Sequence, residues 1–210
     1  LLQWWCRQQD IIVGVPAGHR AYPQLADTVG FLVNSLAIRT TLRGEASFAE
    51  YLGQVRDTAL DAYANQDVPF DQVVEVVNPV RSKGESAPLF RSWFVLHDVP
   101  LPDWELPGVQ AELLEANFLL SVHDIKLSLV AKDGGMEGGL DYRTGLFSAS
   151  TMQRLAQCFG ELVTLIAAEP TTPLNVLNRT LENLWDGKAA APARQAWNAV
   201  RSKRVAVKQG

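Results

Sequence analysis

The chain has 210 residues, 47% of them hydrophobic and 20% charged, which is enough apolar material for a folded core and argues against wholesale disorder. It has no run of about 18 apolar residues and no basic region before a long apolar stretch near its start, so neither a transmembrane helix nor a signal peptide is expected. The net charge is −4, but residues 188–210 hold six basic residues and no acidic one, so residues 1–187 are clearly acidic and a poor partner for nucleic acid.

The first expected elements are two strands. Residues 11–15 form a β-branched run that breaks at Pro16, which is typical of a buried strand followed by a loop. Residues 28–42 form a second apolar segment of strand character, and Gly30 suits a turn or a close backbone approach. Asn34 and Ser35 interrupt this segment, and buried polar side chains need hydrogen-bond partners.

A pair of helices is expected next. Ser47 and Glu50 match a capping box, and apolar residues then recur at helical spacing. This helix should end near Ala64, because Pro69 disfavours helical backbone at the residue before it. A second, shorter helix should follow and end at Asn78.

The junction between these helices is a polar corner. Asp67 and Asp71 are placed to cap the second helix, and Pro69 fits its first turn, where a missing N–H costs nothing. Phe70 can anchor the corner in the core. The residues themselves therefore predict a structural joint.

Strands return after this pair of helices. Residues 88–99, 109–118 and 123–132 have strand character, and residues 136–144 should form the returning strand of a hairpin. A helix capped by Ser148 or Ser150 closes the fold before Pro170. The order of elements predicts an α/β sandwich with a mixed sheet over residues 1–178, followed by a basic, alanine-rich linker or tail over residues 179–210.

The chain contains few residues that are candidates for a catalytic or metal-binding role. Cys6 and Cys158 are expected to be reduced core residues of a cytoplasmic protein, because two distant cysteines make neither a disulfide framework nor a zinc site. The histidines have no metal-ligand spacing, so a structural role is favoured for each of His19, His97 and His123. Phosphate-binding glycine motifs are absent as well. We expect no catalytic residue and no metal site.

Three short motifs follow one another along the chain. They consist of Val29, Gly30, Phe31, Val33 and Asn34, then Asn65, Gln66, Asp67, Pro69 and Phe70, then Pro88, Leu89 and Phe90. In this order they resemble the C-terminal half of a nonribosomal peptide synthetase condensation domain, a member of the chloramphenicol-acetyltransferase-like superfamily. The family motif (I/V)GxFVNT is matched with Ser35 in place of Thr, and (H/N)QDxPFE is matched with Asp71 in place of Glu. A third motif, RDxSxNPLF, is matched only at its end, since Ala87 replaces Asn and Ser82 replaces Asp.

The resemblance implies a chloramphenicol-acetyltransferase-like α/β sandwich that supplies one wall of a tunnel. Carrier proteins deliver phosphopantetheine arms into such a tunnel, and this chain is expected to bind no cofactor of its own. Asn34, Ser35 and Arg20 are the candidates for lining the tunnel; Asn34 and Ser35 could instead satisfy neighbouring backbone, and Arg20 could be solvated. The HHxxxDG motif, which carries the family's central histidine, is absent from the chain. The chain is therefore predicted to be inactive alone.

The expected partners are the N-terminal half of the domain and peptidyl carrier proteins, with no nucleic acid and no membrane. An alternative is a non-catalytic platform that recruits a tailoring oxygenase or hydroxylase, which would tolerate the departures around residues 81–87. Epimerisation and cyclisation domains share the fold of this half and stay open as further alternatives.

Overall fold

The computed structural model describes residues 1–18, 23–25, 27–78, 88–97, 123–132, 135–187 and 205–209. The helices are α1 (Leu2–Cys6), α2 (Phe48–Ala64), α3 (Phe70–Val77), α4 (Ala149–Ala168) and α5 (Leu174–Trp185), and Pro23–Leu25 form a 3₁₀ turn. The strands are β1 (Asp10–Gly18), β2 (Val33–Thr41), β3 (Ser92–His97), β4 (Ile125–Lys132), β5 (Gly135–Tyr142) and β6 (Val205–Gln209).

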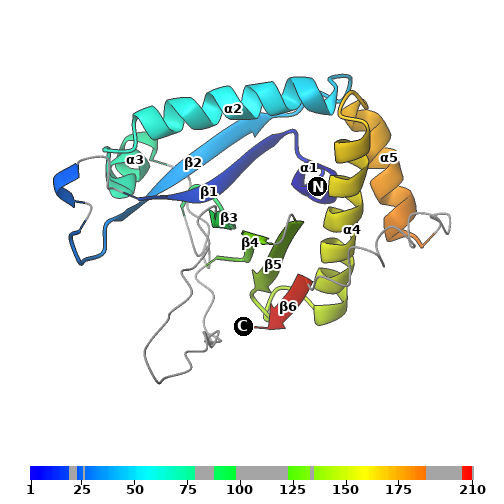
Figure 1. The fold of residues 1–210 in the computed structure, drawn as a ribbon. Coiled ribbons are helices and arrows are strands. Elements are labelled where there is room, and N and C mark those ends of the chain that lie inside the picture. The colour runs from blue at the N-terminus through cyan, green and yellow to red at the C-terminus, as the bar shows by residue number, and fades with distance from the viewer. Residues whose placement is uncertain are drawn as a thin grey trace.

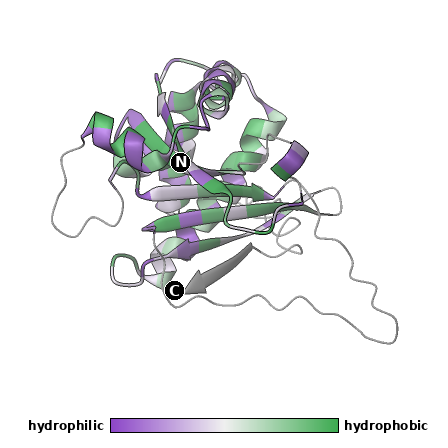
Figure 2. Ribbon diagram, turned by 90° about the vertical axis from the view of Figure 1, so that its left-hand side faces the viewer, coloured by the Kyte–Doolittle hydropathy of each residue, from purple (hydrophilic) through white to green (hydrophobic). Residues whose placement is uncertain are grey.

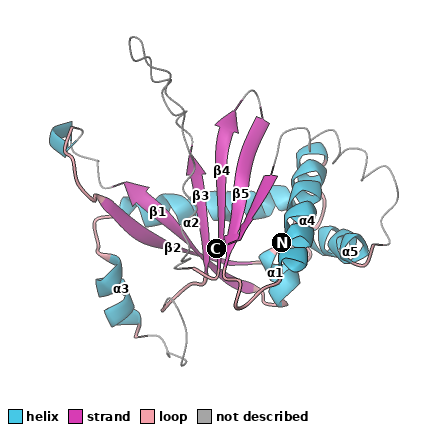
Figure 3. Ribbon diagram, turned by 90° about the horizontal axis from the view of Figure 1, so that it is seen from below, coloured by secondary structure: helices cyan, strands magenta, loops and turns pink. Residues whose placement is uncertain are grey.

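These strands form one mixed sheet in the order β2-β1-β3-β4-β5-β6. The β1–β2 and β4–β5 pairs are antiparallel, whereas β1–β3, β3–β4 and β5–β6 are parallel. Only two residue pairs, Val13–Ser92 and Gly14–Trp93, join β1 to β3, and beyond them the two strands diverge (Figure 3). The sheet is therefore continuous, but only this short pairing joins β1 and β2 to the other strands.

The helices pack around this sheet in two groups. Figure 1 shows α2 running along β1 and β2, while α4 and α5 lie side by side at the other end. The helices carry both hydrophobic and hydrophilic residues, as amphipathic helices at a surface do (Figure 2).

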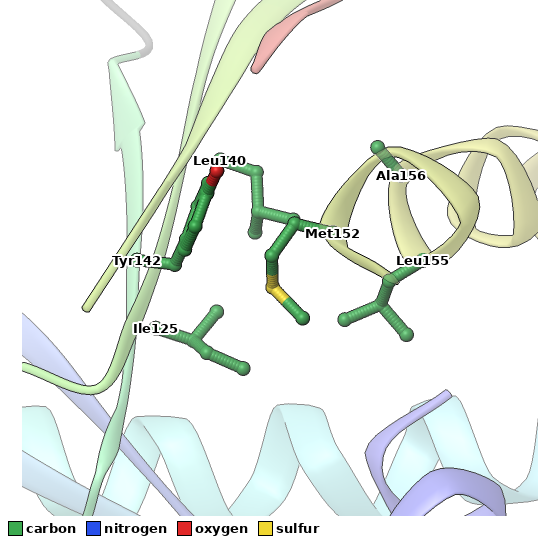
Figure 4. Packing of buried hydrophobic residues seen from close by; sticks show 6 residues of the cluster. All are labelled: Ile125, Leu140, Tyr142, Met152, Leu155 and Ala156. Carbon is green, nitrogen blue, oxygen red and sulfur yellow. The ribbon is translucent and has the colours of Figure 1, made fainter. Parts of the chain in front are cut away.

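Most of the buried hydrophobic residues in the described part of the chain fall into three clusters. The largest lies between β4, β5 and α4 and contains the fully buried Tyr142 and Met152 (Figure 4). A second joins β1 and β2 to α2 around Leu36 and Ile38. A third joins the end of β2 to α4 and α5 around Leu42.

Several expectations from local sequence are confirmed. Ser47 caps α2 in a complete capping box, in which its hydroxyl accepts from the backbone N–H of Glu50 and the Glu50 carboxylate accepts from the backbone N–H of Ser47. Helix α2 ends at Ala64, and Asn78 ends α3 with left-handed backbone, φ 44°. Ser148, rather than Ser150, caps α4. The β4–β5 hairpin forms with the expected antiparallel pairing.

Other expectations need correction. Strand β2 begins only at Val33, so residues 28–32 are not strand; Val29 and Phe31 are 100% and 90% exposed, and none of the described strands pairs with this part of the apolar run. The strand expected at 88–99 is confined to Ser92–His97 among the described residues. Helix α5 runs past residue 178, where a tail was expected to begin, and its Leu181 is buried. The strand expected at 109–118 lies outside the described residues.

Candidate functional site

Asn34, one of the expected tunnel residues, lies at the start of β2 and bonds to the α2–α3 junction. Its Nδ2 donates to the backbone oxygens of Gln66 and Val68 at 2.8 and 2.7 Å. Its Oδ1 accepts from the backbone N–H groups of Ser35 at 2.9 Å and Phe70 at 3.2 Å. Both ends of the amide are therefore engaged by backbone, which is the second of the two arrangements left open by the sequence.

This amide also explains how α3 begins. The N-cap position is Pro69, which has no side-chain acceptor, so the expectation that an aspartate takes the cap position is wrong. Asp71 lies in the first turn, where its charge suits the positive end of the helix. The Asn34 carbonyl, 36 residues away in the sequence, accepts the bond from the first N–H of the helix, at Phe70.

Aromatic rings continue from this corner into the sheet. The ring of Phe70 lies 5.2 Å from that of the buried Phe90, which lies 5.5 Å from Trp93. A Cβ on Gly14 would come within 2.2 Å of the Phe90 ring, so only glycine lets β1 pass beside it. Phe70 thus anchors the corner as predicted, and the PF and PLF motifs meet ring against ring.

His123 completes the aromatic row. Its ring stacks on Trp93 with centroids 4.5 Å apart and planes 3° from parallel. Burial lowers its pKa below the ordinary value; nearby Lys126 acts in the same direction and Asp124 against it. Burial and the stacked geometry favour a packing role for this ring over proton transfer. His97 lies at the exposed end of β3.

A buried carboxylate next to this row was not anticipated. Asp124 is 4% exposed and accepts hydrogen bonds from the Arg91 guanidinium and, at 3.3 Å, from Arg143. Backbone bonds from Asp124 to the Arg91 carbonyl and from Arg143 to the Asp124 carbonyl reinforce the cluster. These residues border β3, β4 and β5, and only the pairing of those strands brings them together. No local pattern in the sequence signals it.

The remaining predicted residues are spread around this corner. Ser35 is half-buried in β2 opposite Pro16, and Gly30 and Phe31 are exposed just before β2. Asn65 closes α2 by donating to the Asp61 carbonyl at 2.8 Å, Asp67 is exposed, and Pro88 and Leu89 are half-buried beside Phe90. Arg20, the third expected tunnel residue, lies outside the described residues, as do residues 79–87.

Among the residues that the structure describes, no group of three or more His, Cys, Asp or Glu is placed to hold a metal ion. None of the described helices is both long and apolar enough to cross a membrane.

A family model for the condensation domain matches residues 1–183. The chain belongs to the condensation-domain family. It is 39% identical over 159 residues to bacitracin synthase 3 of Bacillus licheniformis, across 76% of this chain and 2% of that protein. It is 39% identical over 147 residues to malpinin synthetase of Mortierella alpina, across 70% and 2%. The chain therefore spans only a small fraction of the curated relatives it matches, and these are peptide synthetases, as the sequence resemblance predicted.

Solved structures show the same fold in longer chains. The X-domain from teicoplanin biosynthesis superposes with a TM-score of 0.72 at 20% identity, over 80% of this condensation domain chain and 39% of that chain. A complex of the X-domain and OxyB from teicoplanin biosynthesis gives a TM-score of 0.67 at 20% identity, over 80% and 38%. The starter condensation domain of rhizomide synthetase RzmA gives a TM-score of 0.61 at 17% identity, over 83% and 40%. The predicted chloramphenicol-acetyltransferase-like α/β fold is confirmed.

Proposed function

We propose that this chain is the C-terminal subdomain of a peptide synthetase condensation domain and forms one wall of its tunnel. In the reaction, an acceptor amine on one carrier protein attacks the thioester carbonyl of a donor on another. The new C–N bond replaces the C–S bond, the phosphopantetheine thiol leaves, and the amine gives up one proton. Positioning the amine and removing its proton both need groups within hydrogen-bond reach, and we assign these to the half that carries HHxxxDG.

One observation carries the proposal: the family motif around Asn34 is split into an inner and an outer part. Asn34 is bonded to backbone, whereas Val29 and Phe31 are almost fully exposed. Exposed apolar side chains that stand together mark a contact surface. Because the chain covers about two fifths of the X-domain and starter-domain chains, we assign this surface to contact with the rest of the domain.

Mixing this chain with a separately produced upstream half tests the proposal. We expect amide formation between two carrier-bound substrates only when both halves are present, with carrier proteins supplying phosphopantetheine in the cytoplasm. Phe31→Ala should weaken association of the halves at least several-fold, while Met136→Ala, also at an exposed apolar residue, should not. Amide formation by the isolated chain, or equal association of both variants, would contradict the proposal.

A second candidate function is a platform that recruits a tailoring oxygenase. Its support is the likeness to the X-domain, which has been solved in complex with OxyB. Gel filtration with an oxygenase from the same biosynthetic cluster separates the two functions: a stable complex supports the platform, and its absence counts against it. An intact HHxxxDG motif in the upstream sequence would favour catalysis, and a degraded one the platform.

A further inference from the structure

Strand β2 lies at one edge of the sheet, with β1 as its neighbour among the described strands. The two strands pair without interruption from Asp10–Thr41 to Gly18–Val33, and β2 contains neither proline nor glycine. Its one charged side chain, Arg39, turns back across β1 to bond Asp10. Edge strands are commonly protected by prolines, bulges, charges or short length. The outer side of β2 lacks these devices.

The register of this pair shows which backbone groups of β2 face outward. The backbone N–H of Leu42 donates to the carbonyl of Gln9 at 2.9 Å, in continuation of the same register. In an antiparallel pair, every second residue bonds to the neighbouring strand, and the residues between them direct their N–H and C=O to the other side. Thr40 therefore bonds toward β1, whereas Arg39 and Thr41 direct their backbone groups to the open edge.

A polar hollow of about 310 Å³ lies beside the same part of β2, between the strand and helix α2, which runs along it (Figure 1). The Thr58 hydroxyl donates to the Gln54 carbonyl, and no described residue bonds to the guanidinium of Arg43. Two arginines and no acidic residue belong to the lining, although residues 1–187 are acidic as a whole. The lining residues are Arg39, Thr40, Thr41, Arg43, Gln54 and Thr58.

We propose that an extended peptide segment of a partner protein adds as a strand beside β2 and places an acidic side chain against Arg43. The outward backbone groups of Arg39 and Thr41 supply the ladder bonds of such an addition, and the hollow beside them selects the side chain. Because Asp10 already pairs with Arg39, the free positive charge is that of Arg43, which suits a carboxylate. A small anion would fill the hollow but leave the edge unpaired.

The test uses the complete condensation domain of the parent protein and a phage library of random peptides of about seven residues, which span roughly 23 Å as a strand. Enriched peptides are synthesised with a fluorescent label, and their affinity is measured by anisotropy. Arg43→Gln removes the charge, and its control is Arg56→Gln, at an arginine of α2 that pairs with Asp57 and does not line the hollow. Thr41→Pro removes the outward N–H but no bond to β1, and Thr41→Val is its control.

We expect the enriched peptides to share an aspartate or glutamate. Arg43→Gln should weaken their binding at least several-fold, and replacing the acidic residue of the peptide by glutamine should cause a similar loss in the wild-type domain but little further loss in Arg43→Gln. Thr41→Pro should weaken binding at least several-fold as well, while Arg56→Gln and Thr41→Val should leave it unchanged. N-methylation of one alternate set of peptide N–H groups should abolish binding, and methylation of the other set should not, because only one set faces β2.

Failure to enrich any peptide would overturn the proposal, as would enriched peptides without an acidic residue or with equal sensitivity to methylation of both sets. If Thr41→Pro unfolds the domain, the methylated peptides make the same comparison on the wild-type domain. A wild-type dimer by light scattering that Thr41→Pro dissociates would assign the edge to a second copy and overturn it too. These measurements do not use amide formation, so their failure would leave the proposed function standing, and failure of the reconstitution assay would leave this docking edge standing.

Discussion

Two regions are held together in different ways: the α4 side of the sheet, and the corner where Asn34 at the start of β2 bonds to the α2–α3 junction. Helix α4 has five buried residues and packs Met152 and Leu155 against β4 and β5 without specific polar contacts in that cluster. The corner relies on one asparagine with four backbone contacts and on Phe70, which is only half-buried. Motif residues that identify the family thus form the hydrogen-bonded corner. The most buried residues lie in an apolar core that matches none of the family motifs.

The difference teaches that a sequence motif need not mark a reacting group. A core position can be filled by many apolar side chains of similar volume. A position that must donate twice and accept twice, at fixed angles, has few alternatives to asparagine. Stability measurements on the two regions can test whether they differ in this way.

The largest effect is expected on the α4 side. Met152→Ala removes a fully buried side chain and leaves a cavity between α4 and β5, so it should lower the free energy of unfolding by about 2–5 kcal/mol. Met136→Ala, at a residue of β5 that is about half exposed, is the matched control and should change it by less than about 0.5 kcal/mol. Urea denaturation measures both; similar losses would mean that the α4 side is not a specifically packed core.

Phe70→Ala should have the next largest effect. It removes the ring that meets Phe90, and because Phe70 is half-buried we expect a loss of about 1.5–3 kcal/mol. Phe31→Ala, at an exposed phenylalanine of the neighbouring motif, should leave the melting temperature unchanged. An unchanged melting temperature for Phe70→Ala would remove the structural account of the corner and make Asn65, Gln66 and Asp67 candidates for contact residues again.

Asn34→Ala tests the hydrogen bonds of the corner. It deprives the Gln66 and Val68 carbonyls and the Phe70 N–H of a partner, which should cost about 1–2 kcal/mol. Asn65→Ala removes one exposed side-chain bond and should cost less than about 0.5 kcal/mol. Hydrogen exchange of the Phe70 amide gives a local readout: faster exchange is expected in Asn34→Ala alone, and unchanged exchange would show that this bond does not hold α3.

The smallest effect concerns the one buried charge on α4. Burial raises the pKa of Glu161 above its ordinary value of 4.5, so the folded state holds its proton to a higher pH than the unfolded state does. Unfolding free energy therefore falls as pH rises from about 4.5 through the raised pKa, and the cost remains at neutral pH. Glu161→Gln should be more stable at pH 7 by less than about 1 kcal/mol, with the gain vanishing below about pH 4.5.

Glu182→Gln, at an exposed residue of α5, is the control for this charge and should change the free energy of unfolding by less than about 0.5 kcal/mol. Chemical denaturation between about pH 4 and pH 8 provides the comparison. A gain for Glu161→Gln that grows on acidification would show that the carboxylate is stabilised where it lies, and that the α4 side is more polar than its packing indicates.

Local sequence determined the elements whose causes are local. The capping box at Ser47 and Glu50, the end of α2 at Ala64, the alternating strand β4 and the cap of α4 all depend on residues within a few positions of each other. The order and spacing of the motifs also identified the family, because both can be read from the sequence without knowledge of the fold.

The tertiary structure alone decided how the motif residues are used. The bond from Asn34 to Phe70, the ring contact of Phe70 with Phe90, and the clamp of Arg91 and Arg143 on Asp124 join residues between 19 and 36 positions apart. Strand pairing and helix packing create these contacts, and neither hydrophobic periodicity nor capping rules encode such distances.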